Sequence, residues 1–144
     1  MFKPPIIEII ADNPAPDIKE VIDAALTAYN AEMRAFAPEP SDFAIALRDP
    51  ENGEVVGGLY AVDGYGWALI LLLVVPARYR GLGLGTRLLA EAETIARARG
   101  YIGLWLDTFE FQARPFYEKQ GFALFGELEG GNGATPRYFL KKKF

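Results

Sequence analysis

The positions of hydrophobic and polar residues along the chain follow two periods, one typical of helices and one typical of strands. Apolar side chains recur at helical spacing over residues 18–36 and 84–99. A short helix is predicted over residues 115–120. Short apolar or β-branched runs bounded by turn residues predict strands over residues 6–11, 43–47, 54–62, 67–75, 101–106, 122–125 and 137–140. The pattern therefore predicts a layered α+β or α/β structure.

Turn residues mark where several of these elements end. Pro38 and Pro40 end the first helical region, which forms either one helix or two, because residues 27–30 contain weak helix formers. The Asn-Gly pair at 52–53 predicts a tight hairpin turn, because both residues tolerate φ above zero. Gly100 ends the long second helix. The short connections between the first four strands favour antiparallel pairing.

The longest apolar run covers residues 67–76 and is ten residues long. A membrane-spanning helix needs roughly 20 such residues, so this run predicts a buried strand instead. Near the start of the chain, Glu8 interrupts the short apolar stretch, and we expect no secretory signal. No internal repeat, low-complexity tract or linker is visible. A chain of 144 residues without these features is expected to form a single domain over 1–144.

The chain contains neither histidine nor cysteine. Catalytic triads of the Ser-His-Asp and Cys-His kinds are therefore excluded, as are disulfides and an acyl-enzyme on a thiol. A zinc site would depend on carboxylates alone, and we expect no metal. The absence of cysteine is compatible with a reducing compartment, and a cytoplasmic location is expected.

Acidic residues outnumber basic ones, which gives a formal net charge of −4 and an isoelectric point of about 4.9. Domains that bind nucleic acid carry a basic footprint, so we expect no nucleic-acid partner. We expect no membrane partner either. Mild acidity is common among soluble proteins, and it would also suit a cationic or amine substrate.

The most informative segment is R-G-L-G-L-G-T at residues 80–86, between a predicted buried strand and the amphipathic helix. The first turn of a helix offers backbone N–H groups without intrahelical partners, and glycines remove the Cβ atoms that would keep a phosphate away from them. The arginine and threonine add a cationic fork and a hydroxyl donor. A connection that binds nothing is the alternative, but glycines at a helix start cost about 0.5–1 kcal/mol each. Anion binding explains that cost, so the segment predicts a pyrophosphate cradle.

Two nucleotide-binding motifs fit this segment less well. No Gly-Lys-Ser/Thr follows the glycines, which excludes a Walker A loop. The spacing G-x-G-x-G differs from the dinucleotide fingerprint G-x-G-x-x-G, although Asp107 follows at the end of the next strand. A nucleotide-binding protein is a weaker alternative.

Residues 80–85 resemble the [Q/R]-x-x-G-x-[G/A] motif of the GNAT superfamily of acyl-CoA N-acyltransferases. Val75 lies five residues before Arg80, as a valine of the family's fourth strand usually does. Residues 113–122, A-R-P-F-Y-E-K-Q-G-F, resemble the family's A-x-x-[FL]-Y-x-[KR]-x-G-F segment. The resemblance implies a mixed, mostly antiparallel sheet of about seven strands, with parallel strands 4 and 5 splayed apart, flanked by about four helices.

The resemblance also implies a cofactor and the residues that hold it. The cofactor is acetyl-CoA, whose pantetheine arm would pair with backbone groups of Leu73, Val74 and Val75. Its pyrophosphate would lie on the glycine-rich turn, and two further contacts would come from the second motif. The residues implied for these contacts are Arg80, Gly81, Gly83, Gly85 and Thr86 for the pyrophosphate, and Gln112 and Phe116 for the rest. Tyr117 matches the tyrosine that often protonates the departing thiolate, and a phenol with a pKa near 10 is suited to this step.

Two departures from the family's pattern concern polar residues. Glu110 stands where the family often has an asparagine that contacts the cofactor, and Gln112 is the amide available instead. The predicted fourth strand lacks the carboxylate with which many members deprotonate the amine. Candidates for that base are Asp107, Glu110, Asp63 and Glu32. The alternative is an unassisted route, in which neutral amine binds and water takes the proton.

Acceptor selection in the family usually comes from the first helical region and from the loop before the last strand. Tyr29, Met33, Phe36 and Trp67 are candidates for lining an acceptor pocket, with a core role as the alternative for the first two. The glycine-rich loop at 130–133 is a candidate for closing over a substrate. The three lysines at 141–143 are expected to form a solvated tail.

The sequence therefore predicts an N-acetyltransferase that moves the acetyl group of acetyl-CoA directly to a primary amine of a small molecule or peptide. A homodimer is possible, because homodimers are frequent in the family. A catalytically silent module that binds acyl-CoA is the alternative, and the missing strand carboxylate and Glu110 motivate it.

Overall fold

The structure is a computed structural model that describes residues 1–34 and 41–144. The chain divides into two compact units, Met1–Glu39 and Pro40–Phe144. Each unit is described by itself below, and the single domain expected from the sequence stays a prediction. No helix within the described residues is long and apolar enough to cross a membrane.

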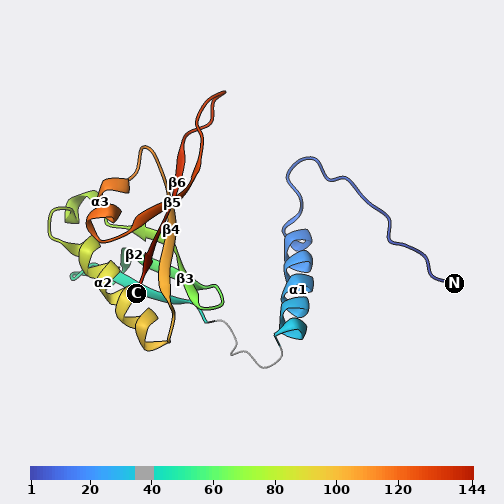
Figure 1. Ribbon diagram of the computed structural model, residues 1–144, viewed down its shortest axis with the longest axis horizontal. Coiled ribbons are helices and arrows are strands. Elements are labelled where there is room, and N and C mark those ends of the chain that lie inside the picture. The colour runs from blue at the N-terminus through green and yellow to red at the C-terminus, as the bar shows by residue number, and fades with distance from the viewer. Residues whose placement is uncertain (35–40) are drawn as a thin grey trace. The chain divides into compact units, whose positions relative to one another are not determined.

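Within residues 1–34 the first unit contains one helix, α1 (Pro16–Met33), which runs without a break (Figure 1). Pro16 lies in its first turn, where the missing N–H is harmless, and the acidic Asp17 suits the positive end of the helix dipole. The predicted strand over residues 6–11 is wrong, because these residues have no regular structure and no sheet ladder among the described residues includes them. A β-branched run forms a strand only with a partner for its backbone groups. Phe36, Pro38 and Pro40 lie outside the described residues.

The second unit is built on a six-stranded sheet. Its strands are β1 (Phe43–Arg48), β2 (Val55–Asp63), β3 (Trp67–Val74), β4 (Gly103–Phe109), β5 (Ala123–Leu128) and β6 (Arg137–Lys143). Their order in the sheet is β1-β2-β3-β4-β6-β5. Only β3 and β4 run parallel, and all other neighbours are antiparallel.

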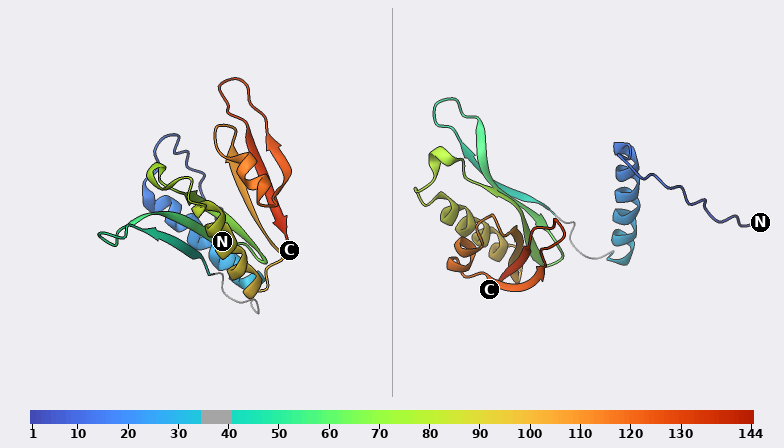
Figure 2. Two further views of the ribbon diagram at one scale, coloured as in Figure 1. Left: turned by 90° about the vertical axis from the view of Figure 1, so that its left-hand side faces the viewer. Right: turned by 90° about the horizontal axis from the view of Figure 1, so that it is seen from above.

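Helices α2 (Leu84–Ala98) and α3 (Arg114–Lys119) lie along one face of this sheet (Figures 1 and 2). The buried stripe of α2 and Tyr117 of α3 belong to one core cluster, in which Leu104, Leu106 and Leu140 of the sheet are fully buried. A short 3-10 turn, η1 (Ala77–Tyr79), precedes the glycine-rich segment. The mixed α/β fold is confirmed, and the part of the chain that the structure describes has six strands and three α-helices where the sequence led us to expect about seven and four.

The parallel strands β3 and β4 separate after a short paired stretch. Their ladder covers three pairs, Trp67 with Gly103, Ala68 with Leu104 and Leu69 with Trp105. Beyond these pairs β3 continues to Val74 beside β2, while β4 continues to Phe109 beside β6. The split that the family resemblance implied is therefore present, and it opens just before Leu106 and Asp107.

The hairpin expected between residues 43–47 and 54–62 is present with a longer turn, whereas the solvated tail expected at residues 141–143 is wrong. The hairpin between β1 and β2 spans residues 49–54, and at its Asn-Gly pair only Gly53 has a positive φ, of 74°. Hydrogen bonds from Asp49 N to Glu54 O and from Gly53 N to Asp49 O close this longer turn, both at 2.8 Å. The lysines at 141–143 form the end of β6 instead of a tail, and they pair with the start of β4. Lys142 Nζ also reaches Glu93 Oε2 on α2 at 2.7 Å.

Candidate functional site

A cavity of about 780 Å³ lies where β3 and β4 separate, bounded by the starts of α2 and α3. It is lined by the end of β3, the glycine-rich segment, the centre of β4 and the turn into α3. All eleven residues that the sequence put forward line it: Leu73, Val74, Val75, Arg80, Gly81, Gly83, Gly85, Thr86, Gln112, Phe116 and Tyr117. The segments that carry the two sequence motifs therefore meet at one place.

The glycine-rich segment leaves donors uncovered at the start of α2. Gly81 and Gly83 have φ angles of 82° and 76°, a conformation that glycine adopts without strain. Gly83 is the N-cap of α2, and no side chain caps this end. The first intrahelical bond runs from Arg87 N to Gly83 O at 3.1 Å, so the N–H groups of the preceding residues have no intrahelical acceptor. A Cβ on Gly83 would meet nothing within 4 Å, which leaves room for an anion beside these donors.

Close packing joins the start of α2 to α3. A Cβ on Gly85 would lie 3.0 Å from the ring of Phe116, which is tighter than an ordinary contact, so glycine at this position lets the ring approach closely. Gln120 Nε2 donates to Thr86 Oγ1 at 3.2 Å, which ties the end of α3 to the same turn. The first turn of α2 is thereby fixed against the wall of the cavity that Phe116 forms.

Arg80 folds back toward the end of β3. Its Nε donates to the carbonyl of Val75 at 3.2 Å, so one backbone acceptor beyond the paired part of β3 is satisfied by the glycine-rich segment itself. Gln112 is held in a similar way on the other side of the cavity. Its Oε1 accepts from Thr108 Oγ1 at 3.1 Å and from Phe109 N at 2.7 Å. The amide oxygen is thus engaged, and the Nε2 group is the part of Gln112 available to a ligand.

Tyr117 lies at the inner end of the cavity and is 9% exposed. Its ring packs edge-on against Phe116 and Phe122, with ring centroids 5.3 and 6.0 Å apart. Burial raises the pKa of the Tyr117 phenol above its ordinary value of 10. The phenol is therefore fully protonated at neutral pH, which suits a proton donor.

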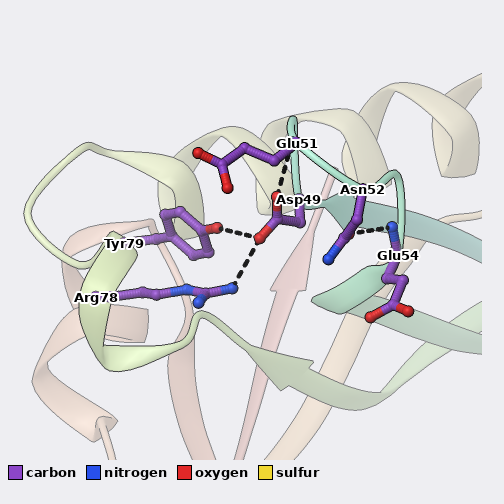
Figure 3. Close-up of polar contacts among 6 residues, drawn as sticks. All are labelled: Asp49, Glu51, Asn52, Glu54, Arg78 and Tyr79. Atoms are coloured by element: carbon purple, nitrogen blue, oxygen red, sulfur yellow. Dashed lines mark hydrogen bonds and ion pairs between the residues drawn. The ribbon is translucent and has the colours of Figure 1, made fainter.

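A polar cluster centred on Asp49 links the β1–β2 turn to η1 (Figure 3). Asp49 Oδ2 accepts from Arg78 Nη2 at 3.1 Å and from Tyr79 Oη at 3.3 Å, while Oδ1 accepts from Glu51 N at 2.8 Å. The Arg78 guanidinium lies over the Tyr79 ring, 4.7 Å from its centroid. The hydrogen bond from the Glu51 backbone, followed by those from Asn52 and Tyr79, holds the pKa of Asp49 below its usual range. Tyr79 also lines the cavity, so this cluster holds η1 in place directly before the glycine-rich segment.

Of the three candidate bases that belong to the second unit, only Asp107 lines the cavity. Asp63 accepts from the backbone N–H of Tyr65 at 3.1 Å, which stabilises the turn after β2. Glu110 is exposed outside the lining. Glu32 belongs to α1 in the other unit.

Several lining residues escaped the sequence analysis. Phe111, Thr108 and Tyr79 line the cavity, and Arg137 pairs with Asp107 across 30 residues of sequence. No local motif marks these contacts, because the sheet and the turn before α3 create them. Trp67 lies elsewhere, in a separate hollow with Trp105, Phe125 and Lys141. Tyr29 and Met33 are exposed on α1, within the first unit.

Comparison with known proteins places this site in a family. A sequence model of the acetyltransferase (GNAT) family matches residues 9–122, which include the glycine-rich segment and α3. The chain belongs to the GNAT acetyltransferase family. This assignment makes it an acyltransferase, and it accounts for the split between β3 and β4.

Two relatives of similar sequence are named as acetyltransferases. "Acetyltransferase Atu2258" of Agrobacterium fabrum is 34% identical over 136 residues, covering 94% of this chain and 98% of its own. "Blasticidin-S acetyltransferase" of Streptomyces morookaense is 45% identical over 94 residues, covering 65% of this chain and 69% of its own.

Solved GNAT structures resemble the chain as well. A crystal structure from Agrobacterium tumefaciens, assigned as an acetyltransferase, has 32% identity and a TM-score of 0.86, covering 96% of this chain and all (100%) of its own. A Bacillus anthracis structure assigned as a streptothricin acetyltransferase has 26% identity and a TM-score of 0.60, covering 76% of this chain and 65% of its own. That structure contains acetyl coenzyme A.

Proposed function

We propose that this GNAT protein is an N-acetyltransferase that transfers the acetyl group of acetyl-CoA directly to a primary amine of a small molecule or peptide. The observation that carries the proposal is that one cavity at the split in the sheet is lined both by an uncapped helix start and by the mostly buried Tyr117. The composition supports direct transfer within a ternary complex, since the chain has no cysteine to carry an acyl group.

Three groups of cavity residues would bind three different parts of acetyl-CoA. Backbone groups of Leu73, Val74 and Val75 would pair with the pantetheine arm along the unpaired edge of β3. The glycine-rich turn would hold the pyrophosphate, because its N–H groups and the helix dipole favour negative charge. The residues for this second role are Arg80, Gly81, Gly83, Gly85 and Thr86. Phe116 and the free amide nitrogen of Gln112 would contact the part between them.

Tyr117 would act as the general acid. When bound, acetyl-CoA supplies a thioester whose acetyl carbon an amine can attack. The sulfur that leaves needs a proton, and the Tyr117 phenol lines the cavity with a pKa that burial raises. General acid catalysis of this kind contributes about 10²–10⁴-fold to a rate.

The acceptor is proposed to be a small molecule that carries a primary amine, with a peptide amine as the broader case. Two related proteins are named for acetylating blasticidin S and streptothricin, which supports a small-molecule acceptor. The proposal includes a cytoplasmic location and a homodimer, and light scattering of the purified protein tests the second. A single domain over residues 1–144 is proposed as well, and cooperative unfolding of the whole chain would support it.

Two measurements test the function. Thermal unfolding with and without acetyl-CoA reports binding, and release of free CoA thiol with a panel of primary amines reports turnover. We expect a rise in Tm with acetyl-CoA and thiol release with at least one amine. No stabilisation by any acyl-CoA would contradict the proposal. Stabilisation without turnover by any amine would instead favour a catalytically silent module that binds acyl-CoA.

A further inference from the structure

Side chains of β4 alternate between the two faces of the sheet at the place where the sheet splits. Leu104, Leu106 and Thr108 are buried on the face that carries α2 and α3. Asp107 lies between them in the strand and points to the opposite face. Its partner across the ladder with β6 is Phe139. A carboxylate therefore stands at the edge of the split, on the face opposite to the helices.

Asp107 is held by one arginine. The Nε and Nη2 atoms of Arg137 lie 2.8 and 2.7 Å from Asp107 Oδ1. The guanidinium lies between the rings of Phe109 and Phe139, 5.2 and 5.5 Å from their centroids. Oδ2 of Asp107 has no protein donor among residues 1–34 and 41–144. One oxygen thus fixes the carboxylate, and the other is free to meet a ligand in the cavity that Asp107 lines.

Asp107 and Tyr117 reach the same cavity from opposite faces of the sheet. Tyr117 belongs to the core on the helix side, whereas Asp107 points away from it. On this basis, and resting on the N-acetyltransferase function proposed above, we propose that Asp107 binds the ammonium group of the acceptor and takes its proton. Arg137 is then a positioning residue that acts through Asp107.

The proton and electron balance of this step is complete with the groups named. The acceptor ammonium gives one proton to Asp107 Oδ2, and the freed lone pair forms the C–N bond to the acetyl carbon. The C–S bond breaks, and its electron pair stays on sulfur, which takes the proton of the Tyr117 phenol. The nitrogen loses its second proton through solvent, which restores the phenol, and Asp107 returns its proton to solvent. The net products are the amide, the CoA thiol and one proton.

The surroundings of Asp107 also indicate a class of acceptor. Phe111 and Leu71 line the cavity and are 76% and 53% exposed, so they offer apolar surface beside the carboxylate. Arg137 is already paired with Asp107, and a carboxylate on the carbon next to the amine would lie against that of Asp107. The charged neighbours of Asp107 on this face are Arg137 and Lys141, both from β6. We expect protonated primary amines on an apolar body, and not α-amino acids, to be the preferred acceptors.

The first experiment compares Asp107→Asn with Glu110→Gln, a matched change in the next turn outside the cavity. With the fastest amine of the panel, we expect Asp107→Asn to lower kcat/KM on the order of 10²-fold at neutral pH. The deficit should shrink as the pH approaches the pKa of the amine, because neutral amine needs no base. Calorimetry in the presence of CoA should show weaker amine binding, while stabilisation by acetyl-CoA is unchanged. Glu110→Gln should behave like the wild type.

The outcomes separate this proposal from the proposed function. A wild type that turns over and an Asp107→Asn variant with the same kcat/KM and pH profile overturn the role of Asp107 alone. A wild type that binds acetyl-CoA but acetylates no amine overturns both. If Asp107→Asn fails to fold, Asp107→Glu replaces it. This variant retains a carboxylate and should keep the wild-type pH profile. Loss of that profile would count against the proposal.

Arg137 and the acceptor class have their own tests. Arg137→Gln should lower kcat/KM less than Asp107→Asn, Arg137→Lys should restore part of it, and the double variant should be no worse than Asp107→Asn. Additive losses would mean that Arg137 acts on its own. For the class, the best amine is compared with its α-carboxylated counterpart, such as phenethylamine with phenylalanine. We expect the amine to be preferred at least about tenfold, and preference for the amino acid would overturn the class.

Discussion

Replacing Gly83 with alanine separates backbone strain from ligand binding. The φ of Gly83 is 76°, and alanine in this left-handed conformation costs about 1–2 kcal/mol. The added Cβ meets nothing within 4 Å, so no steric clash adds to this cost. For a domain of about 100 residues, 1 kcal/mol corresponds to roughly 4 °C in Tm. We therefore expect Gly83→Ala to lower Tm by about 4–8 °C without ligand.

Gly100 provides a matched control, because its φ is 79° and its Cβ would also meet nothing within 4 Å. It follows α2 at the other end and does not line the cavity. Gly100→Ala should therefore lose a similar amount of stability. Acetyl-CoA at 100 times its Kd should stabilise the wild type and Gly100→Ala by about 2.7 kcal/mol, or roughly 10 °C. Gly83→Ala should lose most of this rise, since its methyl group occupies the open space beside the uncapped N–H groups.

Thermal unfolding of the three proteins with and without acetyl-CoA measures both quantities. An equal rise in Tm for Gly83→Ala and the wild type would refute the placement of the pyrophosphate on this turn. An equal loss of the rise in both variants would show that strain at either end of α2 disturbs the site. Only a loss confined to Gly83→Ala supports a cradle at the start of the helix.

Three further variants test other parts of the structure. Tyr117→Phe should lower kcat on the order of 10²-fold while acetyl-CoA still raises Tm, and an unchanged kcat would exclude the phenol as acid. Asp49→Asn should weaken acetyl-CoA binding about fivefold in a titration, with Glu51→Gln as its control. Because the pKa of Asp49 is lowered, its link to η1 should persist down to about its ordinary pKa of 3.8 and be lost in stronger acid. Glu93→Gln should lower Tm by roughly 4 °C at neutral pH, about 1 kcal/mol. The hydrogen bond from Lys142 is the main reason why the pKa of Glu93 is lowered. The difference in Tm between the wild type and Glu93→Gln should therefore vanish once acid protonates the wild-type carboxyl.

The parts of the site that the sequence predicts correctly are those encoded over a few consecutive residues. Glycines at 81, 83 and 85 predict a turn at a helix start. In the structure Gly81 and Gly83 have positive φ angles, and Gly85 lies close to the ring of Phe116. Tyr117 follows from a motif of ten residues. The strands from residue 43 onward are predicted within a few residues, because their apolar runs are bounded by turns.

The parts that sequence reasoning missed depend on residues far apart in the chain. Asp49 and Arg78 meet only because the β1–β2 turn lies beside η1, and Asp107 meets Arg137 only through the register of β4 with β6. Segment 6–11 has the composition of a strand, but no partner strand pairs with it among the described residues. Lys142 looks like part of a solvated tail until Glu93 on α2 is placed beside it. Local pattern does not encode such neighbours.

The split between β3 and β4 explains why this sheet can bind an amide-rich ligand without losing stability elsewhere. Each strand keeps its outer ladder, β3 with β2 and β4 with β6, so the separation leaves unpaired only the inner edges. The end of β3 lines the cavity, and Arg80 donates to the carbonyl of Val75 just beyond it. The pantetheine arm of acetyl-CoA carries amides that can pair with the rest of the edge of β3. Tyr117 and Asp107 line the same opening from opposite faces of the sheet, so the proposed binding and proton transfer would both depend on where one ladder ends.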